Sequence, residues 1–262
     1  MTKRTSSVVL GMIAMLFLLT GAVRAQESSM DVNGGLTLET GLNTYSMTDL
    51  NKNLTALGAS NVSLGWEFGA TAFMQFNKVF EADLGLSYAI AGSSYSVSVP
   101  YYYDAYYGNG FYYTTKTHTI FLPLLSLSFG GRYIIDVANG FYIKPGLALS
   151  LDSITGGSND AYLASTSTDY WGDVTYTYTD YPVSYSGSTV GFVPSVAMEF
   201  LNSSLGWQLE AGFRISKITN GTATNSYGYN YNLVALDFSG FYLKSALSIY
   251  FRSPLAPVQQ EE

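Results

Sequence analysis

The sequence contains no cysteine, and only 12% of its 262 residues are charged. The absence of cysteine excludes disulfides, thiolate metal sites, cysteine nucleophiles and the lipidated cysteine of a lipoprotein anchor. A typical soluble domain carries about 25% charged residues, so this scarcity indicates that much of the surface faces something other than water. Beyond residue 25, the sequence also lacks an apolar run of the ~20 residues that a membrane-spanning helix needs.

Hydrophobic residues make up 47% of the chain, aromatic residues 16%, and there are 23 tyrosines. Low charge, many aromatic side chains and the lack of a spanning helix together favour a membrane barrel built from β-strands. The formal net charge is −7, and it becomes −10 if three basic residues, Lys3, Arg4 and Arg24, are removed with an N-terminal signal. We do not expect such an acidic chain to bind nucleic acid.

The first 25 residues have the three parts of a secretory signal peptide. These are a basic start at Lys3 and Arg4, an apolar stretch over residues 8–19, and small residues at Val23 and Ala25. The alternative is a single membrane helix, which needs about 20 apolar residues. Even when it is extended to Val23, the apolar stretch supplies at most 16 residues. We therefore predict a signal peptide over residues 1–25, cleaved after Ala25.

Eight segments of the remaining chain alternate between apolar and small or polar residues, a pattern that predicts strands with two different faces. The clearest is the second, where Trp66 and Phe68 share one face with other apolar residues while Glu67 lies on the other. In the fourth, the alternation is lost near Pro123, and we expect a β-bulge there. The segments are 36–45, 62–77, 80–90, 119–133, 141–152, 190–200, 205–218 and 241–251.

Short and long connections alternate between these segments, with short turns at Asn77-Lys78 and at 202–204. This order is typical of a meander whose two ends lie on the same side of a membrane. A soluble barrel would point its apolar face inward, but an eight-stranded interior is narrow and filled by its own side chains. Because it has no room for so many aromatic rings, we predict that the apolar face meets lipid. The predicted fold is an all-β, eight-stranded antiparallel up-and-down transmembrane β-barrel with extended extracellular loops.

The signal peptide, the eight segments and the final strand Leu243–Phe251 resemble the small OmpA/OmpX-type family of porin-like outer-membrane β-barrel domains. Ile120–Phe129 (IFLPLLSLSF) and Tyr142–Leu151 (YIKPGLALSL) are similar to paired central strands of such proteins. The resemblance implies a barrel over residues 26–251 in outer-membrane lipid, with extracellular loops and periplasmic ends. It also implies that the barrel-assembly machinery reads Leu243–Phe251. Such barrels usually end on a terminal Phe, whereas residues 252–262 follow here, and we expect a disordered periplasmic tail.

The predicted inner face collects charged residues of both signs. Buried charges must be paired or solvated, so one interpretation is a network of salt bridges and hydrogen bonds that fills the lumen. The other is a narrow ion-selective path along the acidic residues, which would make the protein a small pore. The residues concerned are Glu39, Glu67, Glu81, Asp83, Asp152, Glu199 and Glu210, together with Arg132, Lys144, Arg214 and Lys244.

His118 is the only histidine and lies at the predicted extracellular start of the fourth strand. An enzyme at the barrel rim would need it within hydrogen-bond reach of a nucleophile or an acid. Serine and threonine are abundant in every loop, so the pattern selects none, and we predict neither a catalytic site nor a cofactor. The segment 153–188 holds four aspartates, which we interpret as solvated acids rather than a weak Ca²⁺ site. They are Asp160, Asp169, Asp173 and Asp180.

The long connections are rich in tyrosine, whose rigid ring and polar tip are favoured in binding loops. An aromatic girdle at a membrane surface needs about one ring per strand end, and these loops hold more than that. We therefore predict that they bind a protein or glycan ligand. The candidate binding residues are Tyr101, Tyr102, Tyr103, Tyr106, Tyr107, Tyr112, Tyr113, Tyr170, Trp171, Tyr176 and Tyr178.

Alternation continues into the long connections at 94–99 and 175–179. We therefore expect the third to sixth strands to extend past the membrane as a protruding sheet, whose edges would recruit partner strands. An extra hairpin within 168–186 would raise the strand count to ten. The predicted function is a non-enzymatic surface protein with an adhesive, interaction or envelope-structural role. A small porin-like channel is the alternative, and an outer-membrane enzyme at the rim is the third hypothesis.

Overall fold

The fold is known from a computed structural model, which describes residues 32–56, 60–105, 108–155, 159–169, 172–180, 184–224, 229–232 and 235–251. The predicted signal peptide, 1–25, and the predicted tail, 252–262, lie outside these described residues. In the described part of the chain, no helix has the length and apolar character needed to cross a membrane.

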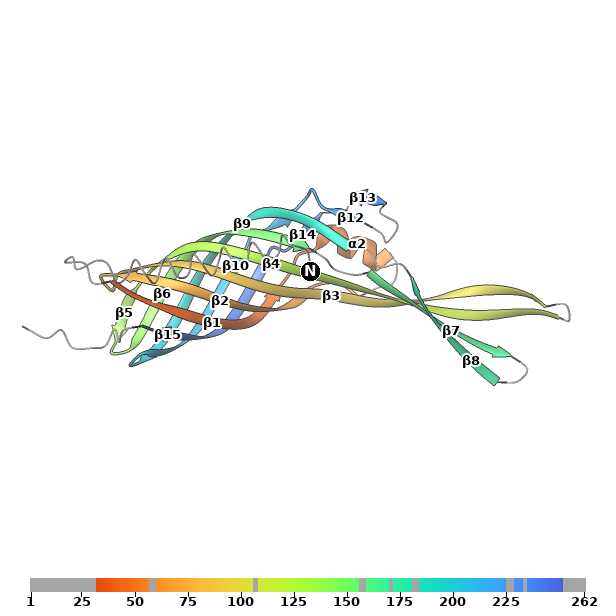
Figure 1. The fold of residues 1–262 in the computed structure, drawn as a ribbon, viewed down its shortest axis with the longest axis horizontal. Helices are drawn as coiled ribbons and strands as arrows, with labels where there is room; N and C mark the ends of the chain where they lie inside the picture. The colour runs from red at the N-terminus through yellow and green to blue at the C-terminus, as the bar shows by residue number, and fades with distance from the viewer. Residues whose placement is uncertain are drawn as a thin grey trace, which may run out of the picture.

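Eight antiparallel strands of the described chain close into a barrel (Figure 1). Each strand pairs with the next in chain order, and the last pairs with the first, so the ring has no open edge. The predicted fold class is therefore confirmed. The barrel strands are β1 (Val32–Thr44), β2 (Leu64–Phe76), β3 (Phe80–Ala105), β4 (Gly108–Tyr133), β6 (Phe141–Thr155), β9 (Ser184–Asn202), β10 (Leu205–Arg214) and β15 (Gly240–Tyr250).

Tight turns join the strands at one end of the barrel, which we call the turn end. Asn77, Lys78 and Ser203 have φ values of 52°, 55° and 60°, the left-handed conformation that tight hairpins require. Strand β5 (Ile135–Ala138) lies beside β6 at this end, where the described chain also begins and ends (Figure 1). The two short turns named from the sequence are thus present, and the short connection between β4 and β6 contains β5.

The opposite end, which we call the arm end, carries the remaining elements (Figure 1). A short helix and four very short strands gather over the barrel mouth, and a further hairpin lies beside β4. These elements are α2 (Thr48–Ala56), β7 (Asn159–Asp169), β8 (Gly172–Asp180), β11 (Lys217–Ile218), β12 (Thr222–Thr224), β13 (Asn230–Asn232) and β14 (Leu236–Asp237).

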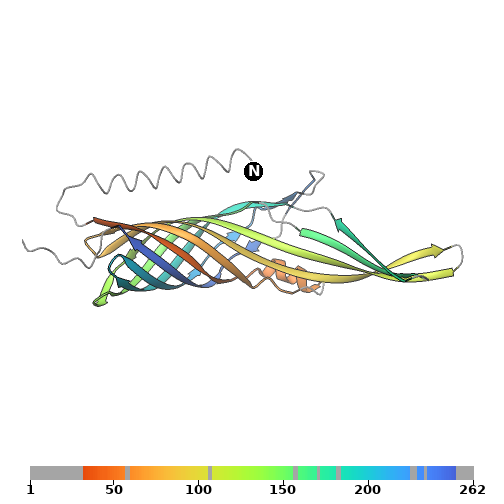
Figure 2. The same cartoon turned by 60° about the horizontal axis from the view of Figure 1, so that its bottom comes forward.

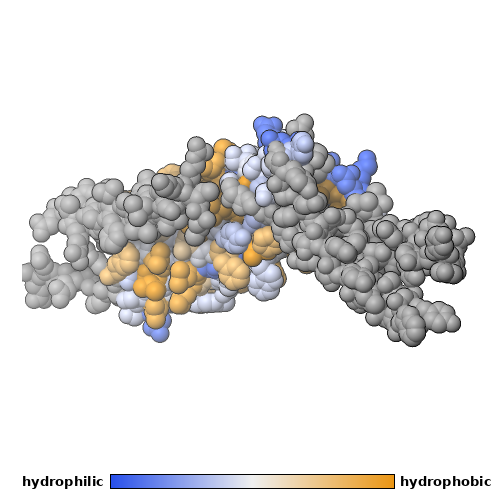
Figure 3. Space-filling view, turned by 45° about the vertical axis from the view of Figure 1, so that its right-hand side comes forward, coloured by the Kyte–Doolittle hydropathy of each residue, from blue (hydrophilic) through white to orange (hydrophobic). Residues whose placement is uncertain are grey.

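Apolar side chains point outward around the barrel, as Figure 3 shows for one face. Trp66, Phe129 and Phe241 are 56%, 66% and 69% exposed, so the predicted orientation of the alternating strands is correct. Small residues on the inner face leave room for polar side chains that cross the narrow lumen. A Cβ added at Gly69 would lie only 2.6 Å from Glu39 Oε1. The Glu39 carboxylate therefore fits here because residue 69 has no side chain.

The β-bulge expected near Pro123 is absent from the β3–β4 ladder, so the expectation is wrong for that side of β4. On the other side, pairing with β6 ends at Leu125↔Ser153 and pairing with β7 starts at Ile120↔Asn159. The β3–β4 ladder keeps one register from Phe80↔Tyr133 to Ala105↔Gly108 and passes through Ile90↔Pro123 without a shift. The alternation is hidden in the sequence because the inward residues Leu122 and Leu124 are themselves apolar and buried. At this level the barrel interior changes from polar to apolar.

These inward residues belong to an apolar cap that closes the arm end. It joins the upper barrel wall to the connections after β1 and β10. Asn51 in α2 fixes one of these connections by donating to the backbone carbonyl of Val62 and accepting from its N–H, at 3.1 Å and 2.7 Å. The cap consists of Tyr45, Met47, Leu54, Val62, Ala89, Ala91, Ile120, Leu122, Leu124, Ile154, Tyr185, Ile218, Ala223, Leu236 and Phe238.

Two aromatic rings anchor this cap, Tyr45 and Phe238. Their ring centroids lie 5.5 Å apart in an edge-to-face arrangement, which is a favourable geometry for aromatic pairs. Burial raises the pKa of Tyr45 to about 12, so its hydroxyl stays protonated at neutral pH. The sequence pattern did not reveal the cap, because many of its members come from the connections after β1 and β10, which lack strand or helix periodicity.

Beyond the barrel, β3 and β4 continue as a long hairpin, as the sequence predicted. The last β3 residue paired with β2 is Ala91, and from there to Ala105 β3 pairs with β4 alone. β7 pairs with β4 over Thr114–Ile120, and β8 pairs with β7. We call this four-stranded sheet, in the order β3-β4-β7-β8, the arm; it points away from the barrel (Figure 2). The extra hairpin therefore extends the arm and does not enlarge the barrel.

Replacing Phe238 by alanine should lower the free energy of unfolding by about 3–5 kcal/mol, because it leaves a cavity in the cap. Urea unfolding of the refolded protein, followed by tryptophan fluorescence, measures this. Val137→Ala is the control, since Val137 is 52% exposed and should change stability by less than about 0.5 kcal/mol. If Phe238→Ala changes the free energy of unfolding as little as Val137→Ala does, the cap does not stabilise the barrel.

Candidate functional site

The barrel interior holds all the charged residues predicted for it, ten in the proposed lumen network and Asp152 beside them. Seven are acidic and four are basic, and nine of the eleven are buried outright. Glu39 and Arg132 are the exceptions, with side chains only 10% and 13% exposed. The ion pairs among these residues fall into three groups along the barrel axis.

The group at the turn end surrounds Lys144 of β6. Its Nζ lies 2.8 Å from Glu81 Oε2 and 2.7 Å from Glu199 Oε2. Tyr250 donates a hydrogen bond to Glu199 Oε2 at 2.7 Å and accepts one from Lys144 at 3.2 Å. The Phe73 ring packs edge to face against Tyr250, with centroids 4.9 Å apart. This layer of ion pairs and rings fills the lumen near the turns.

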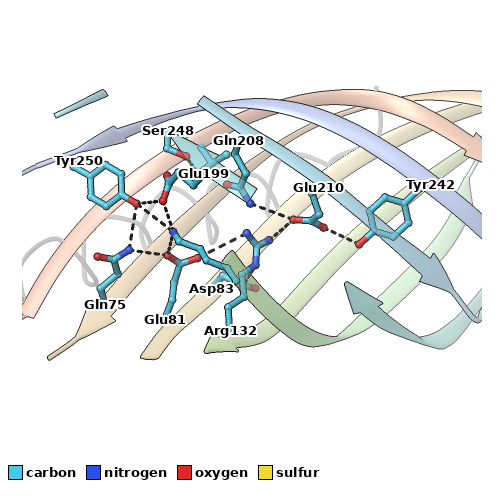
Figure 4. Close-up of polar contacts among 12 residues, drawn as sticks. Gln75, Glu81, Asp83, Arg132, Glu199, Gln208, Glu210, Tyr242, Ser248 and Tyr250 are labelled. Carbon is cyan, nitrogen blue, oxygen red and sulfur yellow. Dashed lines mark hydrogen bonds and ion pairs between the residues drawn. The ribbon is translucent and has the colours of Figure 1, made fainter. Parts of the chain in front are cut away.

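The middle group centres on Arg132 of β4 (Figure 4). Its guanidinium Nη2 lies 2.8 Å from Glu210 Oε2, and its Nε lies 3.3 Å from Asp83 Oδ2. A longer contact of 3.8 Å joins Nη1 to Glu81 Oε1 and links this group to the first. Tyr242 donates to the other oxygen of Glu210 at 2.7 Å. One arginine thus ties together three strands across the lumen.

The third group lies nearest the cap and centres on Glu67 of β2. Lys244 Nζ lies 2.8 Å from Glu67 Oε1 and 3.0 Å from Glu39 Oε1. Arg214 Nη2 lies 3.1 Å from both Glu67 oxygens, and Asn43 donates to Oε2 at 2.7 Å. Three neighbours thus satisfy one fully buried carboxylate, which is the condition for keeping a charge out of water.

A cavity of about 50 Å³ lies between the middle and third groups, bordered by Arg132, Arg214 and Lys244 among others. A water molecule needs about 10–15 Å³ of such space, so the cavity has room for a few. Within the described residues, Ser126 Oγ, Asp152 Oδ1 and two guanidinium nitrogens of Arg214 have no hydrogen-bond partner. Buried polar atoms of this kind are the usual binding sites of ordered water in proteins.

The interior therefore has the chemistry of a packed polar core. The apolar cap closes it at the arm end, and the Lys144 layer fills it at the turn end. Among the described residues, no three His, Cys, Asp or Glu side chains are arranged to hold a metal ion. His118 lies within β4, paired in register with Tyr95 of β3 and Ala161 of β7. It is thus inside a strand of the arm, whereas we expected it at the start of a barrel strand.

The candidate tyrosines of the long connections lie in the arm where they are described. Tyr101, Tyr102 and Tyr103 are in β3, opposite residues 112, 111 and 110 of β4. Tyr112 and Tyr113 are therefore in β4. Tyr176 and Tyr178 are in β8, opposite Ser165 and Leu163 of β7. Tyr106, Tyr107, Tyr170 and Trp171 lie outside the described residues.

Sequence reasoning missed several uncharged members of the lumen network, namely Asn43, Gln75, Tyr242 and Tyr250. The signal for the two tyrosines was available. The outward residues of the last strand are odd-numbered, which leaves Tyr242, Lys244 and Tyr250 on the inner face together. The predicted lumen network contains only charged residues, so it leaves out these hydroxyls as partners for buried carboxylates.

Neither a family model nor a curated protein matches the sequence. Among solved structures, the chain is similar to outer membrane protein OprG of Pseudomonas aeruginosa, with 9% identity over 86% of this chain and 96% of that one, at a TM-score of 0.44. A major outer membrane protein of Thermus thermophilus has 11% identity over 83% and 99% of the two chains, at a TM-score of 0.41. These values are too low to carry functional information, and the barrel is defined by the chain's own strand pairing.

Substituting Glu67 by glutamine should destabilise the barrel by about 3–5 kcal/mol, because Lys244 and Arg214 would stay buried without their shared carboxylate. Urea unfolding of the refolded protein measures the change. The control is Asp49→Asn, which breaks the exposed 3.8 Å pair between Asp49 and Lys217. That change should cost at most about 1 kcal/mol. A Glu67→Gln protein as stable as this control would contradict a stabilising network.

Proposed function

We propose that this chain is a non-enzymatic surface protein of the bacterial outer membrane. The barrel is its anchor and the arm is its binding element. In this proposal the turn end faces the periplasm and the arm projects outside the cell. The observation that carries the proposal is the arm, a sheet continuous with the barrel wall that extends far beyond the apolar cap (Figure 2).

The outer face of the barrel supports the proposal that the barrel is surrounded by lipid. Exposed apolar side chains surround it, and aromatic rings pack against each other near both ends. Phe200 lies between Phe141 and Trp207 near the turns, with centroids 4.7 Å and 5.8 Å apart. Phe213 and Phe241 pack edge to face near the arm, 4.9 Å apart. Rings at both borders of an apolar band are typical of barrels that cross an outer membrane.

The same proposal names two partners of the barrel itself. One is outer-membrane lipid along the apolar band. The other is the barrel-assembly machinery, which would read Leu243–Phe251 at the end of the chain's last strand. In β15, Leu243, Leu247 and Ile249 are exposed while Tyr242 and Lys244 are buried. This supports the proposal, because a signal strand needs one continuous apolar face.

The arm supports binding of a protein or glycan ligand. Its strands carry many of the chain's tyrosines, a residue favoured in binding surfaces. Within the described residues, β8 pairs with β7 alone and β3 beyond Ala91 pairs with β4 alone. The sheet therefore has two edges whose backbone groups are available to an extended partner.

Two loop-shortening variants test this function. Replacing residues 101–112 by Asn-Gly keeps the pair Pro100↔Tyr113 at the end of a shortened hairpin, and replacing 162–179 keeps Ala161↔Asp180. Asn-Gly favours the turn that closes such hairpins. Cells displaying either variant should lose most of the surface attachment that the full-length chain confers, while the barrel still forms.

The heat-dependent gel shift of the detergent-extracted protein is the control for barrel formation. If attachment survives both replacements, the arm is not the binding element. If the gel shift is lost, the strands outside the membrane are needed for the barrel, and the division into anchor and arm fails.

A small pore is the alternative function, and the polar cavity of about 50 Å³ favours it. The cap and the Lys144 layer oppose it, because an ion would have to displace both. We therefore expect the full-length protein to give no resolvable conductance steps in a planar bilayer. Stable single-channel steps would support the pore instead.

A further inference from the structure

We infer that the outer edge of β8 pairs antiparallel with β8 of a second copy of this chain, held in a facing membrane. This inference rests on the proposed function, in which the arm lies outside the cell. The partner would therefore be the same protein on a neighbouring cell, and the contact a short intermolecular sheet. Three observations carry it: the composition of the two arm edges, the symmetry of the β8 sequence and the direction of the strand.

The two edges of the arm differ in how they are protected. The β3 edge contains Pro100, which has no N–H to donate to a partner strand. β8 contains neither proline nor an internal charge, because Val174–Thr179 separates Asp173 from Asp180. Natural edge strands normally carry charges, proline or bulges that prevent pairing. β8 has such protection only at its ends, so it is the edge suited to a partner.

The central five residues of β8 read the same in both directions around Thr177. Residues 175–179 are Thr-Tyr-Thr-Tyr-Thr. An antiparallel pair centred on Thr177 places each threonine opposite a threonine and each tyrosine opposite a tyrosine. Aromatic and threonine cross-strand pairs are favourable in antiparallel sheets. An isologous contact between two copies requires a surface that is complementary to itself, and this strand meets that requirement.

Charge selects the antiparallel arrangement over the parallel one. In the antiparallel register Asp180 lies opposite Val174 of the second copy, so no carboxylates face each other. A parallel in-register pair would place Asp173 opposite Asp173 and Asp180 opposite Asp180. Like charges directly opposite each other destabilise a sheet.

The direction of β8 then determines where the second barrel lies. The β7–β8 hairpin points its tip away from the barrel in both views (Figures 1 and 2). The pair Asp169↔Gly172 is at the tip, and β8 runs from there back toward the barrel. Two antiparallel copies of β8 therefore leave their barrels at opposite ends of the contact. Two barrels in one membrane would need parallel strands, so the contact bridges two membranes.

The test uses the full-length chain refolded into phosphatidylcholine vesicles, with two vesicle populations that carry different dyes. We expect vesicles with protein in both populations to tether, as measured by light scattering and dye colocalisation. Protein-bearing vesicles mixed with protein-free vesicles should stay separate. Tethering to protein-free vesicles would mean that the arm binds lipid, and absence of tethering between protein-bearing vesicles would also overturn the inference.

Two charge variants test the register. Thr175→Lys/Thr179→Asp places lysine opposite aspartate of the second copy in the antiparallel pair, so tethering should persist. Thr175→Lys/Thr179→Lys places lysine opposite lysine, and tethering should fall roughly tenfold. If both variants lose tethering, the antiparallel register is wrong. If both keep it, β8 is not the contact.

The gel shift confirms in each case that the barrel has formed. The outcome is separable from the proposed function, because that function is measured by arm-dependent attachment of cells to other surfaces. If cells attach through the arm but vesicles do not tether, the self-pairing of β8 is contradicted and the surface-binding role is still supported. If neither arm-dependent attachment nor vesicle tethering is observed, both the surface-binding role and the self-pairing of β8 are contradicted.

Discussion

The structure depends on the narrowness of an eight-stranded barrel. Such a lumen must be filled by the side chains of its own wall. This excludes most large apolar residues from the inside and leaves them on the outer face. It also forces the inward charges close together, where each needs a partner of opposite sign or a hydrogen bond. Because of this crowding, Glu67 contacts three polar neighbours and Arg132 lies close to three carboxylates.

The barrel wall and its orientation were readable from the sequence because strand periodicity is local. For example, Trp66 and Phe68 identify the outward face of β2, and Glu67 identifies its inward face. The inward charges followed from the same alternation, and so did the extension of β3 and β4. Which acid meets which base did not follow, since these pairs join strands far apart in the chain. Arg214 and Glu67, for example, are separated by 147 positions.

The apolar cap shows where this reasoning fails. Many of its residues come from the connections after β1 and β10, which have no regular period, and the others come from the inner faces of barrel strands that are far apart in the chain. The inward Leu122 and Leu124 then looked like an interruption of the strand. They are residues of the barrel wall that form part of the cap. A change from polar to apolar residues on an inner face indicates that something apolar packs there, and it does not require a bulge.

The unbroken ladder between β3 and β4 also has a mechanical consequence. β3 and β4 run without a break from the arm into the barrel wall, where their hydrogen bonds to β2 and β6 run perpendicular to the strands. A pull on the outer end of the arm is carried along both strands and loads these wall bonds in shear. The force is then shared among many bonds and not applied to one at a time, as it would be if the strands were peeled apart. The arm is thus built to resist tension along its own length.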